Sequence, residues 1–386
     1  MLRSSTGARV RGGLDSLHYE AVVIGAGWHP ALFRTEADTL LESPPEVLHP
    51  HALSMPLESA QTLIARSSLA AEVLSPAGVA TLENVVAEVA DSFLALNIEM
   101  SSIAVRASRA GDKLANWSSR EVAGEIGGRL VDAGWKVDLS NPEVVLRVHL
   151  LAPSEHTAHP DNLQTESVVA WGLTIHEGDD WAQRTAPNRP FFKPVSLDPK
   201  LARAMVNLAC PNGGSLLDPF CGTGGILVEG VLCGLDSYGG DLAWPMVTGA
   251  RENAKWAQER GGSGTFEVRN GSATDLANWH DIAPFDGFAF DPPYGRNAWK
   301  SGDGFELFEG ALSACVQVAT ANARLVTLVP WSPSAIHGPL DEGVSFGKRW
   351  SEIEQAFSSA GWVIRATFPI RVHRSLARLL VVAERA

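Results

Sequence analysis

Two stretches in the C-terminal half of the chain hold residue types that could do chemistry. The first is the loop Asp218-Pro219-Phe220-Cys221-Gly222-Thr223-Gly224-Gly225, and the second is Asp291-Pro292-Pro293-Tyr294. Glycines lack side chains and so let a backbone approach a bound group closely. A carboxylate, a carbonyl on a rigid Pro-Pro and an aromatic ring could hold a flat group that bears an amine. Together the two stretches predict a cofactor site and a target-base site on one sheet.

The glycine loop indicates a nucleoside-bearing cofactor. Gly222 and Gly224 would admit the cofactor, with Phe220 beside them. Asp241, about 20 residues further on, could accept hydrogen bonds from ribose hydroxyls. A carboxylate at Asp218 would repel a pyrophosphate but attract the ammonium and sulfonium groups of S-adenosylmethionine. Asp218 therefore favours S-adenosylmethionine over a dinucleotide, and the second stretch decides between the two.

The second stretch indicates that the acceptor is an exocyclic amine of a base. Such an amine is a poor nucleophile because its lone pair is conjugated with the ring, and two acceptors aimed at its hydrogens favour the reactive geometry. Asp291 and the carbonyl of Pro292 would be these acceptors, and Tyr294 would stack on the base. Cys221 could instead be a covalent nucleophile, but a small side chain inside the loop is the simpler interpretation. No metal is required.

The elements around both stretches predict a doubly wound α/β domain. From Ser215 onward strands and helices alternate. A final pair of strands, Trp362 to Phe368 and Leu376 to Ala383, is too close in sequence for a crossover helix and should be antiparallel. The fold class is therefore α/β, with a C-terminal Rossmann-like, seven-stranded, mostly parallel sheet and an N-terminal α+β region.

The N-terminal half predicts a binding module rather than a reaction centre. A strand leads into Gly25-Ala26-Gly27, but the third glycine of a dinucleotide fingerprint is missing, so we interpret it as a plain strand followed by a helix from about Pro30 to Leu41. Helical spacing follows from Leu57 to Leu74 and from Thr81 to Phe93. The next elements expected are a strand at 103–107, a helix at 119–134 and a strand at 144–151.

The chain as a whole resembles the archaeal tRNA (guanine-10-N2) methyltransferases. In the C-terminal half the resemblance rests on D-P-F-C-G-T-G-G, on D-P-P-Y-G-R, on Arg189-Pro190-Phe191-Phe192 and on the late run Arg371 to Leu376. In the N-terminal half it rests on Glu125 to Gly134, which looks like part of a THUMP domain. It implies a ferredoxin-like segment at 1–55, a THUMP-like RNA-binding domain at 56–155, a linker at 156–189 and a methyltransferase domain at 190–386.

The family resemblance implies methylation of a tRNA guanosine at N2, most simply at position 10, with one or two methyl groups added. The partner would be tRNA, the catalytic chain would be monomeric, and the need for a small activating subunit is left open. Basic residues predicted to contact tRNA are Arg106, Arg109, Lys193, Arg296, Arg371 and Arg374. Two alternatives remain, namely methylation of another RNA or DNA exocyclic amine, such as adenine N6, and an RNA-binding protein with a degenerate methyltransferase domain.

The chain departs from the family at the adenine end of the cofactor site. Such enzymes usually carry an acidic residue after the third strand, where this chain has Ser272. Adenine would then be contacted by the Ser272 hydroxyl, the Ala273 backbone or Asp275. Lys193 also stands where the family usually has histidine.

Composition fits a globular protein of the cytoplasm. Hydrophobic residues make up 45% of the chain, which supports packed cores. Four isolated cysteines without C-x-x-C spacing argue against a disulfide framework, and no apolar run approaches the roughly 20 residues that cross a bilayer. The net charge of −13 opposes nucleic-acid binding overall, but the segments 106–147 and 365–378 are locally basic and could contact phosphates.

Overall fold

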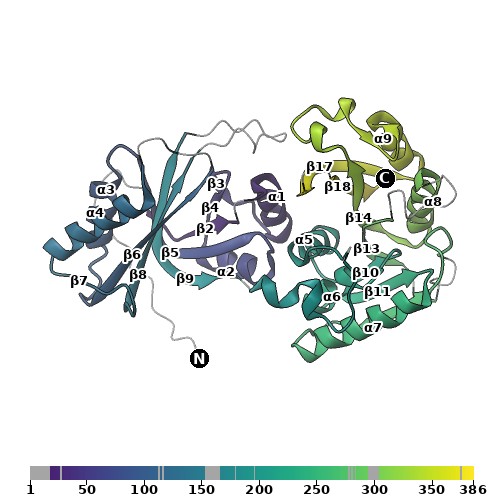
Figure 1. Ribbon diagram of the computed structural model, residues 1–386, viewed down its shortest axis with the longest axis horizontal. Coiled ribbons are helices and arrows are strands. Elements are labelled where there is room, and N and C mark those ends of the chain that lie inside the picture. The colour runs from purple at the N-terminus through teal and green to yellow at the C-terminus, as the bar shows by residue number, and fades with distance from the viewer. Residues whose placement is uncertain are drawn as a thin grey trace.

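The computed structural model of the chain contains two large sheets that lie side by side with helices between them (Figure 1). The structure describes residues 18–26, 28–111, 114, 117–152, 166–178, 180–194, 196–276, 279, 281–282, 284–293, 304–373 and 376–386. Within these ranges, no helix is both long enough and apolar enough to cross a membrane.

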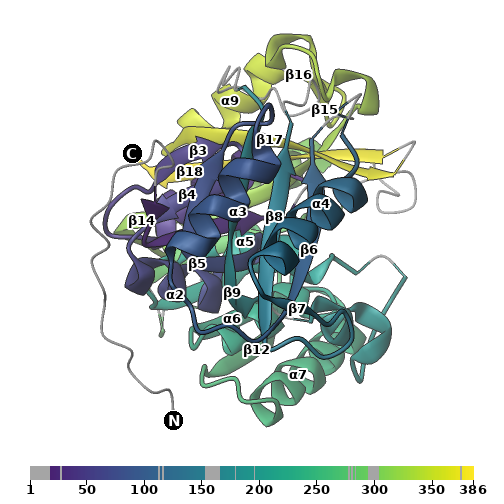
Figure 2. The ribbon, with the colours of Figure 1, turned by 90° about the vertical axis from the view of Figure 1, so that its left-hand side faces the viewer.

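The N-terminal sheet has nine strands. They run in the order β3-β4-β2-β5-β9-β8-β6-β7, and β1 pairs with β5. The strands are β1 (His18–Tyr19), β2 (Ala21–Gly25), β3 (Glu46–His49), β4 (Ala52–Met55), β5 (Ala70–Ala80), β6 (Ser102–Ala110), β7 (Lys136–Val137), β8 (Val144–Leu151) and β9 (Val168–Glu177). The helices are α1 (Pro30–Leu40), α2 (Leu57–Arg66), α3 (Val85–Ala95) and α4 (Ser119–Asp132). Figure 2 shows α3 and α4 side by side on the outer face of this sheet.

In the N-terminal half, one expectation from the sequence is confirmed and another is wrong. Strand β2 pairs antiparallel with β4 and β5, so it does not open a parallel dinucleotide-binding unit, as expected. The helix expected from Leu57 to Leu74 is wrong beyond Arg66, because the chain turns at Ser67 and enters β5 at Ala70. Pairing with β2 on one side and β9 on the other outweighs the helical spacing of the Ala-Ala-Glu-Val-Leu run. Strand β9, which falls inside the expected linker, lies between β5 and β8.

The C-terminal sheet has seven strands in the order β12-β11-β10-β13-β14-β18-β17. The four pairings from β12 to β14 are parallel and the two that involve β18 are antiparallel, which confirms the expected α/β fold. The strands are β10 (Ser215–Asp218), β11 (Asp236–Asp241), β12 (Phe266–Asn270), β13 (Phe285–Phe290), β14 (Ala319–Trp331), β17 (Trp362–His373) and β18 (Leu376–Arg385). A small separate hairpin is formed by β15 (Val344–Ser345) and β16 (Lys348–Arg349).

Helices cover both faces of this sheet. They are α5 (Pro199–Ala209), α6 (Gly225–Leu232), α7 (Trp244–Glu259), α8 (Gly304–Gln317) and α9 (Trp350–Ser359). Ala289 of β13 packs in the core that contains α5, whereas its neighbours Phe288 and Phe290 pack in the core that contains α8 and α9. Helix α5 begins after Asp198, whose side chain caps it by accepting hydrogen bonds from the backbone N–H groups of Lys200 and Leu201.

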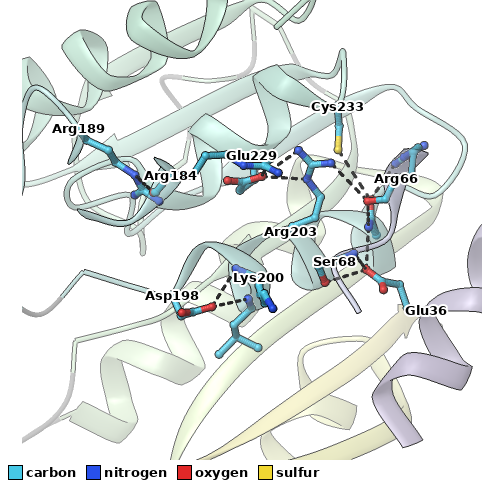
Figure 3. A network of polar contacts seen from close by, with 12 residues as sticks. Glu36, Arg66, Ser68, Arg184, Arg189, Asp198, Lys200, Arg203, Glu229 and Cys233 are labelled. Carbon is cyan, nitrogen blue, oxygen red and sulfur yellow. Dashed lines mark hydrogen bonds and ion pairs between the residues drawn. The ribbon is translucent and has the colours of Figure 1, made fainter. Parts of the chain in front are cut away.

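One hydrophobic core joins the two halves. Leu32 and Phe33 of α1 belong to the same buried cluster as Met205 of α5 and Phe368 of β17. A buried polar network crosses the same junction (Figure 3). In it, the Arg66 guanidinium donates to the carbonyl oxygens of Pro211 at 2.8 Å and of Cys210 at 3.1 Å. The N-terminal module, which comprises β1 to β9 and α1 to α4, is therefore packed directly against the C-terminal half.

Candidate active site

Three aspartates meet at the carboxyl edge of the C-terminal sheet. Asp218 ends β10, Asp241 ends β11, and Asp291 follows the last residue of β13. The strand order reverses between β10 and β13, which is where ligands bind in open parallel sheets. Burial raises the pKa of Asp218, and the negative charges of Asp291 and Asp241 raise it further. The carboxylates that the sequence singled out are therefore close enough to interact.

The glycine loop is tied to both neighbouring strands. The Asp218 carboxylate accepts a hydrogen bond from the Phe220 N–H at 3.0 Å, and Asp241 accepts one from the Gly222 N–H at 3.1 Å. The Cys221 N–H donates to the Gly240 carbonyl at 2.9 Å. These bonds set the loop across the ends of β10 and β11.

The two glycines of the loop have different roles. Both have positive φ, 50° at Gly222 and 75° at Gly224, a conformation that glycine adopts without strain. A Cβ on Gly224 would lie 3.0 Å from the Cβ of Ala250, so this glycine lets the loop pack on α7. A Cβ on Gly222 would have no neighbour nearer than the Phe220 carbonyl oxygen at 3.9 Å. A side chain at Gly222 would therefore project into open space above the loop.

Asn253 of α7 ties the segment at Phe191, which precedes the C-terminal sheet, to this loop. Its side chain is fully buried and accepts a hydrogen bond from the Phe191 N–H at 3.0 Å. It also donates to the carbonyl oxygens of Phe191 at 2.6 Å and of Thr223 at 2.7 Å. The Phe191 ring lies against Gly249, where a Cβ would approach to 2.0 Å. The amide of Asn253 thus joins the backbone at Phe191 to the glycine loop at Thr223.

Asp291 is held from the far side by an arginine. The guanidinium of Arg378 on β18 lies 3.1 Å from Asp291 Oδ2. Pro292, the next residue, is buried, which fixes the backbone that follows β13. Tyr294 and Arg296 lie outside the described residues.

Cys221 does not have the environment of a nucleophile. Burial raises the pKa of its thiol well above the usual range, and the charges of Asp218 and Asp241 raise it further. The thiol therefore stays protonated, in keeping with the packing role predicted for a small side chain in the loop.

Known proteins match both halves of the chain. Residues 187–334 match the RMKL-like methyltransferase domain, and residues 80–152 match the THUMP domain. A tRNA (guanine(10)-N2)-dimethyltransferase of Methanothermobacter thermautotrophicus is 32% identical over 255 residues, which cover 66% of this chain and 65% of that protein. Its counterpart in Pyrococcus abyssi is 31% identical over 262 residues, which cover 67% of each chain. The chain belongs to the tRNA (guanine-10-N2) methyltransferase family.

The match spans about two thirds of the length of these family members. The fold has a solved counterpart in TrmN from Thermus thermophilus, with a TM-score of 0.54 and 20% identity, covering 95% of this chain and 100% of that one. Asp218, Asp241 and Asp291 all fall inside the matched methyltransferase domain. Helices α3 and α4 and strands β6 and β8 fall inside the matched THUMP domain.

The residues that follow β12, which the sequence assigns to the adenine end of the site, form contacts through an amide and hydroxyls. The Asn270 side chain donates to the carbonyl oxygens of Asp241 at 2.9 Å and Leu242 at 2.8 Å, which joins the ends of β12 and β11. The Ser272 hydroxyl lies 2.9 Å from that of Thr274. Ala273 is buried. Ser272 and Ala273 thus follow the strand end that is joined to Asp241, while Asp275 is exposed, and contact of these residues with adenine stays a prediction.

The basic residues predicted to contact tRNA are spread over the molecule. Arg106 and Arg109 are exposed on β6, and they lie on opposite faces of the sheet because side chains alternate along a strand. Lys193 is exposed, 5.6 Å from the Phe191 ring, and Arg371 is exposed on β17. Arg374 lies outside the described residues. No common patch follows from these positions among the described residues.

Sequence reasoning missed three residues of the site. The sequence alone does not single out Asn253, Asn270 or Arg378, the partner of Asp291, as site residues. A signal existed for Asn253, which lies at helical spacing with Ala250 and Ala257 on the buried side of α7. Arg378 had no such signal, because its contact depends on how the strands are ordered.

Proposed function

We propose that this protein transfers methyl groups from S-adenosylmethionine to the N2 amine of a tRNA guanosine, at position 10. The observation that carries the proposal is the convergence of Asp218, Asp241 and Asp291 beside the open space over Gly222. The THUMP domain and the family of the chain support tRNA as the substrate.

The residues present fit the cofactor. An acidic pocket favours the ammonium and sulfonium groups of S-adenosylmethionine and disfavours a pyrophosphate. Asp218 would attract the cationic end, Asp241 would hold the ribose, and Ser272 and Ala273 would border adenine. When bound, S-adenosylmethionine supplies a methyl group to which the amine nitrogen forms a bond as the carbon–sulfur bond breaks and sulfur keeps the electron pair.

Asp291 and Pro292 act on the acceptor. The carboxylate of Asp291 and the carbonyl of Pro292 accept hydrogen bonds from the amine, which turns its lone pair out of conjugation with the base. The amine loses one proton during the transfer, and an aspartate at the edge of the site can pass that proton to solvent. Tyr294 stacks on the base.

Six basic side chains and the assembly of the chain complete the proposal. Arg106, Arg109, Lys193, Arg296, Arg371 and Arg374 contact tRNA phosphates. The chain acts in the cytoplasm as a monomer, and a small activating subunit joins it if the purified chain alone is inactive.

The test is methylation of unmodified tRNA transcripts with labelled S-adenosylmethionine, followed by nucleoside mapping. Label in N2-methylguanosine or N2,N2-dimethylguanosine at position 10 is expected, and none in a transcript with adenosine at that position. Asp291→Asn should lower kcat by about 100-fold or more while cofactor still binds in calorimetry. Transfer that survives Asp291→Ala, or label in duplex DNA instead of tRNA, would contradict the proposal. Absence of cofactor binding would revive the RNA-binding alternative.

A further inference from the structure

Arg378 reaches the active site from a strand that is not adjacent to the one carrying Asp291. Asp291 follows β13, and Arg378 lies on β18, with β14 between them. The register pairs Arg378 with Pro330 of β14 and with Ile370 of β17. The guanidinium nevertheless lies 3.1 Å from Asp291 Oδ2. The position of this pair is therefore set by the antiparallel end of the sheet.

The pair is sheltered from water. The side chains of Arg378 and Asp291 are 13% and 19% exposed. Nearby on the same hairpin, Arg365 forms a pair of similar length with Glu384, at 2.8 Å, but these side chains are 56% and 34% exposed. Screening by water and salt weakens the outer pair far more than the inner one. The Arg378–Asp291 pair is thus the one suited to fixing an orientation.

Asp291 lies among acidic groups at the sheet edge. Asp218 ends β10 and is 2% exposed, and burial first and then the charges of Asp291 and Asp241 raise its pKa. Arg378 approaches from the opposite side of the sheet edge. By holding Oδ2, it fixes the plane of the carboxylate and hence the direction in which Oδ1 points.

We propose that Arg378 is a positioning residue, which holds the Asp291 carboxylate in the orientation that accepts the hydrogens of the acceptor amine. This inference rests on the proposed function. It separates Arg378 from the other basic residues of the segment 365–378. Arg371 is exposed and suits a phosphate contact, whereas Arg378 is largely buried and bound to an aspartate.

The experiment compares kcat and KM for a tRNA transcript between the full-length wild-type chain and the Arg378→Gln variant. We expect kcat to fall by about 10- to 100-fold, since a misplaced catalytic group costs this much. The KM for tRNA and the calorimetric Kd for S-adenosylmethionine should stay within about threefold. Arg378→Lys should recover part of kcat because it keeps the charge but not the planar fork. Arg324→Gln, which breaks the 3.3 Å pair between Arg324 of β14 and Glu384 outside the basic segment 365–378, is the control and should leave kcat unchanged.

A double variant decides whether Arg378 acts through Asp291. If it does, Asp291→Asn combined with Arg378→Gln will be no slower than Asp291→Asn alone. Multiplied losses in the double variant would overturn the inference, as would an unchanged kcat in Arg378→Gln. A raised KM with a salt slope reduced by about 1 would assign Arg378 to a phosphate instead. If the wild-type chain does not methylate tRNA, the proposed function itself is wrong, whatever the variants do. Circular dichroism and cofactor binding show whether each variant is folded.

Discussion

The side-chain amide of Asn207 on α5 donates a 2.8 Å hydrogen bond to the Glu36 carboxylate on α1. Both side chains are fully buried. The same amide donates to the Arg66 carbonyl at 2.9 Å and accepts from the Arg66 guanidinium at 3.3 Å. Glu36 also accepts the Ser68 N–H at 3.1 Å. Figure 3 shows Glu36 and Arg66 meeting at this point, where the N-terminal module joins the catalytic sheet.

Asn207→Leu should therefore destabilise the junction. The change removes hydrogen bonds to a buried carboxylate and to a buried carbonyl, which costs about 2–3 kcal/mol. Asn207→Asp should cost more, because a second carboxylate would face Glu36. Urea unfolding followed by circular dichroism measures both. A loss below about 0.5 kcal/mol in Asn207→Leu would show that the network contributes little to stability.

A buried histidine pair should make the N-terminal module sensitive to acid. His49 and His51 stack with ring centroids 5.6 Å apart, and each is 1% exposed. The pKa of His49 is lowered to about 4. Burial is the largest cause, the charges of His51 and Arg34 also lower the pKa, and a backbone hydrogen bond to Ala152 opposes them. Burial and the charge of Arg34 lower the pKa of His51 to about 4.

Acid should destabilise the folded chain because the two histidines stay neutral when they are buried. Between about pH 6.5 and pH 4 the unfolded chain takes up protons that the folded chain does not, so stability is complete above this window and falls through it as pH drops. The loss is up to roughly 3 kcal/mol per histidine. Urea unfolding at about pH 7 and pH 4.5 should show this difference in the wild type and a much smaller one in the His49→Gln, His51→Gln double variant. The exposed His176→Gln change is the control and should leave the wild-type difference intact.

The sequence predicted the catalytic half better than the N-terminal half, for a physical reason. After Ser215 three parallel strands, β10, β11 and β13, end at or just before an aspartate, so Asp218, Asp241 and Asp291 mark strand ends as well as the proposed site. The spacing of apolar residues could not show that β5 begins at Ala70, because hydrogen bonding to β2 on one side and β9 on the other stabilises this strand. The domain boundaries expected at 55, 155 and 189 remain a prediction.

Contacts between distant segments were beyond sequence reasoning. Arg378 reaches Asp291 only because β18 pairs antiparallel with β14 in one register. Likewise, Glu36 and Asn207 meet only because α1 packs on α5. Both cases depend on the order of strands or on the packing of helices, which periodicity within one segment does not reveal.

Gly222→Ala should weaken cofactor binding without a large loss of stability. The added Cβ would enter the open space over the loop, where a cofactor would lie against the backbone. We expect the Kd for S-adenosylmethionine to rise by about tenfold or more, together with about 1 kcal/mol of backbone strain. Gly347→Ala is a matched control, since Gly347 also has positive φ, at 77°, and no atom lies within 4 Å of its added Cβ. If both variants bind cofactor equally well, the space over Gly222 is not the cofactor site.

Asn253→Ala should separate the glycine loop from the segment that precedes it. The change leaves the Phe191 N–H and the carbonyl oxygens of Phe191 and Thr223 without their partner in a buried place. Such groups cost about 1–3 kcal/mol each when unsatisfied, so the loop should relax and the Kd for S-adenosylmethionine should rise by about tenfold. Asn253→Asp tests the mechanism, because a carboxylate can still accept the Phe191 N–H but would face the two carbonyl oxygens with no proton to donate. Its Kd for S-adenosylmethionine, measured by calorimetry, should therefore rise at least as much as that of Asn253→Ala. Wild-type affinity in Asn253→Ala would show that the clamp does not shape the cofactor site.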